Sequence, residues 1–158
     1  GHFRGVATVV TKLFNAVQPQ KAFFGQKDAQ QAAVIRQMVR DLNMSVEIVT
    51  QPIVRERDGL AMSSRNTYLN PEERRAALVL SKSLAAAQST YEKGERDATT
   101  LRRIMEKIIN TEPLARLEYV SCADYDTLEE MSIISKKALI SMAVYLGKTR
   151  LIDNVVLE

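Results

Sequence analysis

Apolar residues in the first third of the chain recur at two different spacings. Between Val6 and Val17 they follow the i, i+3, i+4 spacing of an amphipathic helix, which Pro19 ends. Short apolar runs then alternate with a second helical stripe. The predicted elements are a helix to residue 17, a strand at 21–24, a helix at 28–42, a strand at 46–49 and a short strand at 53–54. This order predicts a βαβ unit of a parallel sheet.

The remainder of the chain has a different pattern, which begins with a polar loop over 55–66. Asn70, Pro71 and Glu73 follow the order of N-cap, first helical residue and capping-box partner, and so predict the start of a helix. The predicted elements are a helix at 71–93 closed by Gly94, a helix at 97–110, strands at 117–121, 138–146 and 150–156, and a hairpin turn at 147–149. We expect two helices packed with a small antiparallel sheet.

These two patterns predict an α/β chain in two parts, with a boundary near residues 52–55. A βαβ piece with two or three strands cannot cover both faces of a parallel sheet, so the first part needs strands that this sequence does not supply. The chain also opens at Gly1, without Met and without a signal-peptide pattern. Both observations favour a truncated chain, and a glycine left by tag removal is the alternative origin of Gly1.

Composition removes several classes of protein. The 158 residues are 46% hydrophobic and 26% charged, which is ordinary for a globular protein. No apolar run is long enough for a transmembrane helix, so no membrane partner is expected. The 22 basic and 19 acidic residues are interspersed and give a net charge of +3, which does not favour nucleic acid. A single cysteine, Cys122, favours a reducing, cytoplasmic setting and a small buried side chain.

The first candidate site is the segment from Gly25 to Asp28, between a predicted strand and a predicted helix. Ligands of parallel sheets bind at the carboxyl ends of strands, where helix N-termini attract phosphate. Gly25 permits close backbone approach, Lys27 carries the charge to neutralise phosphate, and Asp28 suits a ribose hydroxyl or a position near a metal. The alternative is purely structural, because Asp28 and Gln31 also match a capping box.

A second candidate site is the cluster Met62-Ser63-Ser64-Arg65 on the polar loop. Two hydroxyls beside a guanidinium suit an oxyanion or triphosphate, and Gly59 is a candidate hinge. An ordinary loop with a solvated Arg65 is the alternative. His2 is the only histidine, so any histidine-dependent chemistry would have to use it, and an incidental terminal residue is the alternative.

Four motifs, in order and in register, resemble the pantothenate synthetase family. They are His2-Phe3-Arg4-Gly5-Val6, Phe24-Gly25-Gln26-Lys27-Asp28 with Gln31, Asp58-Gly59-Leu60-Ala61-Met62-Ser63-Ser64-Arg65-Asn66, and Arg150-Leu151-Ile152-Asp153-Asn154. The resemblance extends over essentially the whole chain. It implies a partial Rossmann-like domain of the nucleotidyltransferase, class I synthetase-like kind at 1–53, and a small α+β domain with the phosphate-binding loop at 54–158.

This resemblance implies an ATP-dependent ligase of the coenzyme A pathway. Pantoate attacks the α-phosphate of ATP, which arrives with Mg²⁺, to give pantoyl adenylate and pyrophosphate. The amine of β-alanine then displaces AMP and gives pantothenate. A homodimer is implied for the full-length protein, and no metal ligands are implied in this chain.

The resemblance also implies site residues. Lys27, Ser63, Ser64 and Arg65 would act in catalysis, and Gln31 and His2 would contact pantoate. The implied ATP-binding positions are Gly25, Gln26, Lys27, Asp28, Val54, Met62, Ser63, Ser64 and Arg65.

The sequence departs from the family in one major respect, since the family's N-terminal half and its H-x-G-H phosphate-binding motif are absent. Gln26 stands where glutamate is common, and Ala29 where an aromatic residue is common. We therefore expect half of an active site and no turnover by this chain alone. The alternative function is a non-catalytic nucleotide-binding or interaction module that keeps the βαβ phosphate site.

Overall fold

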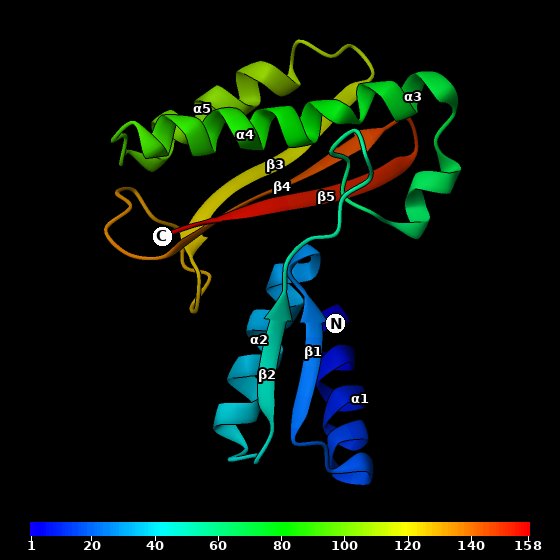
Figure 1. Cartoon of the computed structure of the whole chain (residues 1–158), viewed down its shortest axis with the longest axis vertical. Helices are drawn as coiled ribbons and strands as arrows, with labels where there is room; N and C mark the ends of the chain where they lie inside the picture. Colours follow the sequence, from blue (N-terminus) through cyan, green and yellow to red (C-terminus); the bar gives the residue numbers. More distant parts are fainter. The chain divides into compact units, whose positions relative to one another are not determined.

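A parallel two-stranded sheet with two helices on one face forms the unit Gly1–Ile53 of the computed structural model, which describes residues 1–158 (Figure 1). Its elements are α1 (His2–Val17), β1 (Lys21–Gly25), the 3₁₀ turn η1 (Gln26–Asp28), α2 (Ala29–Asp41) and β2 (Glu47–Gln51). The predicted βαβ unit is confirmed, because β1 pairs in parallel with β2 from Lys21↔Glu47 to Gly25↔Gln51.

The two sheet faces of this unit differ in burial. Phe24 and Ile48 pack with Phe14 of α1 and Ile35 of α2 in one apolar cluster. On the opposite face, Phe23 remains 63% exposed. The two helices therefore pack on one face of the sheet, whereas parallel sheets normally have both faces covered.

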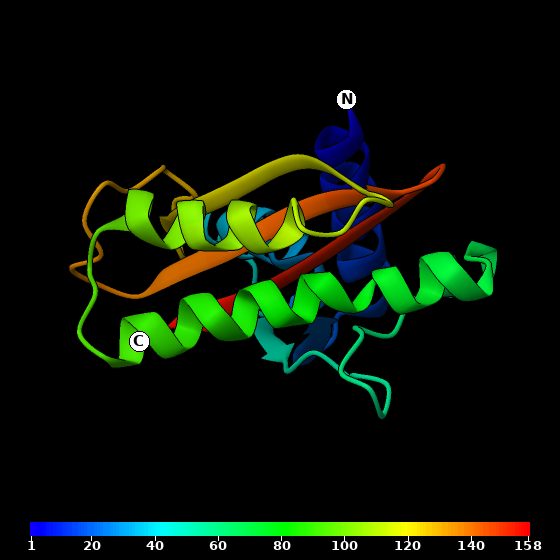
Figure 2. The same cartoon turned by 90° about the horizontal axis from the view of Figure 1, so that it is seen from above.

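Two helices over one face of an antiparallel sheet form the second unit, Val54–Glu158 (Figures 1 and 2). Its elements are the 3₁₀ helix η2 (Ser64–Tyr68), α3 (Pro71–Ala76), α4 (Leu78–Glu92), α5 (Ala98–Ile109), β3 (Ala115–Asp124), β4 (Ala138–Leu146) and β5 (Thr149–Leu157). The sheet order is β3-β4-β5, with both pairings antiparallel, as predicted. Its core joins Leu80 of α4 and Leu101 of α5 to Ile140 and Val144 of β4.

Two of the predicted elements differ from the structure. Residues 53–54 form no strand, because Pro52 has no N–H to extend the ladder and the Val54 carbonyl accepts from Met62 N instead. The helix predicted at 71–93 is interrupted at Ala77, where the backbone tightens and Leu80 N bonds to Ala77 O at 3.2 Å. The capping box of Asn70 and Glu73, with Pro71 in the first turn, is present.

Gly147, in the turn between β4 and β5, lies in a position where a side chain is not readily accommodated. Its φ is +57°, and a Cβ placed there would collide with the Glu73 carboxylate of the capping box. We expect Gly147→Ala to lower the free energy of unfolding by about 2 kcal/mol, from left-handed backbone strain and loss of part of the cap. Gly94→Ala is the control, because Gly94 also has positive φ but faces open space; about 1 kcal/mol is expected there.

Urea unfolding followed by tyrosine fluorescence measures this difference. All five tyrosines lie in Val54–Glu158 and the chain has no tryptophan, so the signal reports the second unit. Equal losses in the two variants would show that Glu73 does not constrain Gly147.

Candidate functional site

The segment Gly25–Asp28 lies at the carboxyl end of β1, at the edge of the sheet where β2 also ends. Gly25 has extended backbone, and a Cβ there would meet nothing within 4 Å. The chain then turns through η1 into α2, with Lys27 half-buried and Asp28 exposed. This edge therefore presents open backbone, a lysine and a carboxylate at a helix start.

The capping-box interpretation of Asp28 and Gln31 is wrong. Asp28 precedes α2, but its side chain makes no capping hydrogen bond. Its backbone, at φ −99° and ψ 53°, is not in the extended conformation from which N-cap side chains reach the helix amides. The carboxylate is thus not committed to the helix.

Gln31 and His2 lie on the two helices of the same unit. Gln31 is half-buried in the first turn of α2, whereas its neighbour Gln30 is exposed. His2 is the first residue of α1, where its ring lies 5.2 Å from that of Phe3 in a tilted arrangement. Both residues therefore belong to the unit Gly1–Ile53, but no hydrogen bond joins them.

The polar loop of the second unit begins as a tight hairpin. Arg55 and Ala61 form an isolated antiparallel β-bridge. On either side of it, Glu56 N donates to Leu60 O at 2.8 Å, and Met62 N donates to Val54 O at 2.9 Å. Gly59 has φ +95° in the turn, a conformation that glycine adopts readily and other residues rarely do. At the open end of the hairpin, Val54 is 66% and Met62 is 54% exposed.

Ser63, Ser64 and Arg65 follow the hairpin directly at the start of η2. The Ser63 hydroxyl accepts from Arg65 N at 3.2 Å and caps this short helix. Ser64 and Arg65 are exposed, and the Arg65 guanidinium makes no hydrogen bond or ion pair within the protein. Two hydroxyl groups and a guanidinium therefore lie on one turn, and groups of these kinds can bind an oxyanion.

An ionic network, which the sequence did not predict, holds the hairpin against α3. Arg74 of α3 contacts Glu56 at 2.6 Å and Asp58 at 2.9 Å. Asn66 donates to the Glu56 carboxylate at 2.7 Å and to Ala61 O at 3.1 Å. Arg74 is the main cause of the lowered pKa of both Glu56 and Asp58. The ion pairs of Glu56 and Asp58 with Arg74 therefore hold the hairpin against α3.

The candidate residues form two clusters in two units. Gly25, Gln26, Lys27, Asp28 and Gln31 lie near one edge of Gly1–Ile53, and Val54, Met62, Ser63, Ser64 and Arg65 lie on one loop of Val54–Glu158. No group of three or more histidine, cysteine or acidic side chains is arranged to hold a metal ion. No helix is both long enough and apolar enough to span a bilayer. Cys122 is buried, and its burial raises the pKa of its thiol to about 11.

Comparison with known proteins gives a consistent result. The sequence model of the family described as "Pantoate-beta-alanine ligase" matches residues 1–156. The chain is 62% identical to a pantothenate synthetase of Roseiflexus sp. (strain RS-1), over all of this chain and 57% of that protein. It is 60% identical to that of Thermoanaerobacter sp. (strain X514), over 98% of this chain and 55% of that protein. The chain thus spans about half the length of these curated relatives.

Solved structures extend the likeness to the fold. A pantothenate synthetase from Thermus thermophilus matches with a TM-score of 0.92 at 45% identity, over 98% of this chain and 56% of that one. A pantoate-beta-alanine ligase from Francisella tularensis, described as complexed with beta-gamma ATP and beta-alanine, matches with a TM-score of 0.68 at 28% identity. That match covers 99% of this chain and 51% of the other.

Proposed function

We propose a function from the premise that this chain belongs to the pantoate-beta-alanine ligase family: it supplies half of the active site that condenses pantoate with β-alanine. The carboxylate of pantoate attacks the α-phosphate of ATP and pyrophosphate leaves. The amine of β-alanine then attacks the acyl carbon of pantoyl adenylate, and AMP leaves with the pantoyl carboxylate oxygen that carried it. The family match over residues 1–156 is the observation that carries this proposal.

Phosphoryl transfer of this kind depends on positioning and charge stabilisation more than on a protein nucleophile. Lys27, at the sheet edge of the first unit, is suited to neutralise charge on the phosphates. Asp28, whose carboxylate makes no capping bond, is suited to accept from a ribose hydroxyl. Gly25 and Gln26 would line the nucleotide with their backbone.

The loop of the second unit supplies the complementary donors. Ser63, Ser64 and Arg65 would contact the triphosphate, because the guanidinium offers forked donors that no protein group already uses. Val54 and Met62, hydrogen-bonded to each other through their backbones, form an exposed apolar pair suited to the face of adenine. Mg²⁺ would arrive bound to ATP as part of the substrate.

Gln31 and His2 are the residues that we assign to pantoate. An amide and an imidazole can both hydrogen-bond hydroxyl or carboxylate groups. We assign residues 1–53 to the C-terminal part of a nucleotide-binding Rossmann-like domain and residues 54–158 to a small C-terminal domain. A homodimeric assembly of the full-length protein and a cytoplasmic setting complete the proposal.

A chimeric protein tests this function. The part of the Roseiflexus relative that lies outside the matched segment is fused upstream of residues 1–158. We expect this chimera to form pantothenate and AMP only when ATP, pantoate and β-alanine are all present, and we expect no turnover by the 158-residue chain. A soluble, folded chimera that forms no pantothenate would contradict the proposal.

Titration of the unfused chain with ATP distinguishes the proposed function from the alternative, a non-catalytic nucleotide-binding module. A half-site should bind ATP far more weakly than the chimera does, because the upstream phosphate contacts are missing. ATP affinity equal to that of the chimera would instead favour a self-sufficient nucleotide-binding module.

A further inference from the structure

One carboxylate of β5 lies where the strand pattern calls for an apolar residue. Alternation along the strand places Leu151, Asp153, Val155 and Leu157 on one face. Leu151, Val155 and Leu157 belong to the apolar core of the second unit or pack against it, whereas Asp153 is only 1% exposed. A buried charge destabilises a fold unless it is paired, so Asp153 requires an explanation.

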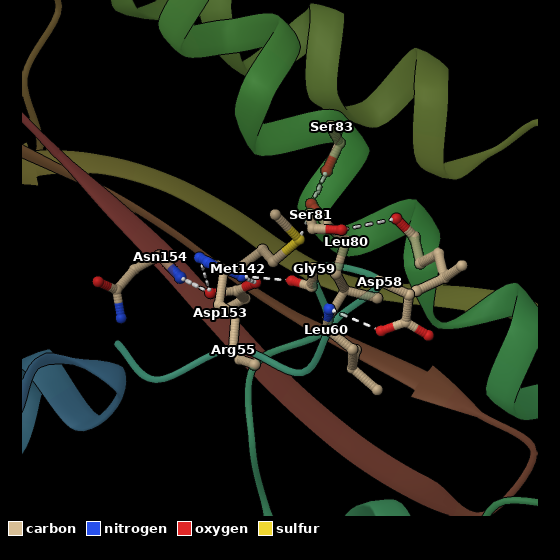
Figure 3. Close-up of polar contacts among 12 residues, drawn as sticks. Arg55, Asp58, Gly59, Leu60, Leu80, Ser81, Ser83, Met142, Asp153 and Asn154 are labelled. Carbon is tan, nitrogen blue, oxygen red and sulfur yellow. Dashed lines mark hydrogen bonds and ion pairs between the residues drawn. The ribbon is translucent and has the colours of Figure 1, made fainter. Parts of the chain in front are cut away.

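Arg55 supplies that pairing in a two-pronged geometry. Its Nη1 lies 2.7 Å from Asp153 Oδ2, and its Nη2 lies 3.0 Å from Oδ1 (Figure 3). Asp153 Oδ1 also accepts from the backbone N of Asn154 at 2.8 Å, so both carboxylate oxygens are satisfied. Planar guanidinium and carboxylate groups in this arrangement fix orientation as well as distance.

The same guanidinium ties the tip of the hairpin to its base. Arg55 Nη1 donates to Gly59 O at 3.0 Å, while the Arg55 backbone bridges Ala61 in the opposite strand of the hairpin. Asp153 of β5, which is 98 positions from Arg55 in the sequence, therefore holds the hairpin. Met62 closes the open end of the hairpin, and Ser63, Ser64 and Arg65 follow it directly.

We propose that Asp153, acting through Arg55, is a positioning residue that fixes the loop from Met62 to Arg65 in its ATP-binding geometry. The expected effect on ATP binding rests on the proposed function, whereas the expected effect on the conformation of the loop does not. Asp153 is buried while 32% of the Arg55 side chain is exposed, and ion pairs removed from water are often replaceable by apolar residues without loss of stability. The pair is thus better explained by the orientation that it gives the loop.

The double variant Arg55→Met/Asp153→Leu separates positioning from stability, because it removes both charges together and keeps apolar bulk at each site. We expect it to fold and to keep slow amide exchange in α4 and β4. The amides of Met62 and Asn66, which donate to Val54 O and Ser63 O, should exchange faster than in the unchanged chain. Unchanged exchange at these two amides would overturn the proposal.

Kinetics of the same variant in the chimera test the consequence for ATP. We expect the KM for ATP to rise about tenfold or more, since small misplacements at a reacting site are costly, and the KM for pantoate to stay unchanged. A merely structural defect would lower the active fraction and reduce kcat alone. Faster loop exchange with an unchanged KM for ATP would also overturn the proposal.

Glu118→Gln is the matched control. Glu118 pairs with Arg150 of β5 at 2.7 Å, but this pair is exposed and does not contact the hairpin. Loop exchange and ATP kinetics should remain those of the unchanged protein. If the chimera without substitutions shows no pantoate-dependent turnover, the proposed function is wrong. The amide-exchange measurement would still decide whether Asp153 fixes the loop.

Discussion

Replacing Lys27 with alanine is expected to slow adenylate formation by the chimera roughly 10²–10³-fold, the loss typical of one preorganised donor at a developing charge. Lys27 is half-buried in η1, immediately after the strand end where parallel sheets bind ligands. Its ammonium would stabilise the negative charge that moves onto the leaving pyrophosphate. Pantoate-dependent pyrophosphate release in a single turnover measures the effect.

Lys21→Ala is the control for that substitution. Lys21 begins the same strand and forms an exposed ion pair with Glu47 at 3.0 Å, which contributes little to stability. We expect nearly parental adenylation in this variant. Equal rates for Lys27→Ala and the unchanged chimera would remove Lys27 from the site.

The second large effect is expected for Arg65→Lys, which keeps the charge and removes the forked geometry. We expect a loss of about tenfold to a hundredfold in kcat/KM for ATP, because an ammonium cannot reproduce paired guanidinium contacts to phosphate oxygens. Arg65 is exposed and its guanidinium makes no hydrogen bond or ion pair within the protein, so the substitution should leave the unfolding transition unchanged.

Arg57→Lys controls for a general effect of losing an arginine from this loop. Arg57 is exposed in the hairpin turn, and its replacement should leave the kinetics for ATP unchanged. Parental kinetics for Arg65→Lys would support the alternative in which Arg65 is an ordinary solvated side chain.

Local sequence signals predicted much of the fold because the physics behind them is local. Apolar spacing identified the βαβ unit, and the order of Asn70, Pro71 and Glu73 identified a capping box that the structure contains. The strand Ala138–Leu146 was predicted with its exact bounds, since a continuous apolar run is bounded by turn residues on its C-terminal side. The strand predicted at 53–54 is wrong because the apolar residue Val54 instead pairs with Met62 at the open end of a hairpin.

The ion pair between Arg55 and Asp153 could not be predicted from the sequence. Arg55 and Asp153 are 98 positions apart, and nothing in either local pattern indicates that they meet. Asp153 left one signal, a carboxylate in phase with the apolar positions of its strand. The capping interpretation of Asp28 failed for a related reason, because the 3₁₀ turn before α2 sets a backbone conformation that residue spacing does not reveal.

Exchange of labelled pyrophosphate into ATP by the chimera tests the central claim most directly, because it detects the adenylate without the second step. If this chain completes a site for pantoyl adenylate, label should enter ATP when pantoate is present and β-alanine is absent, and Lys27→Ala should abolish most of it. Exchange that requires β-alanine, or no exchange by a chimera that binds ATP, would contradict the account.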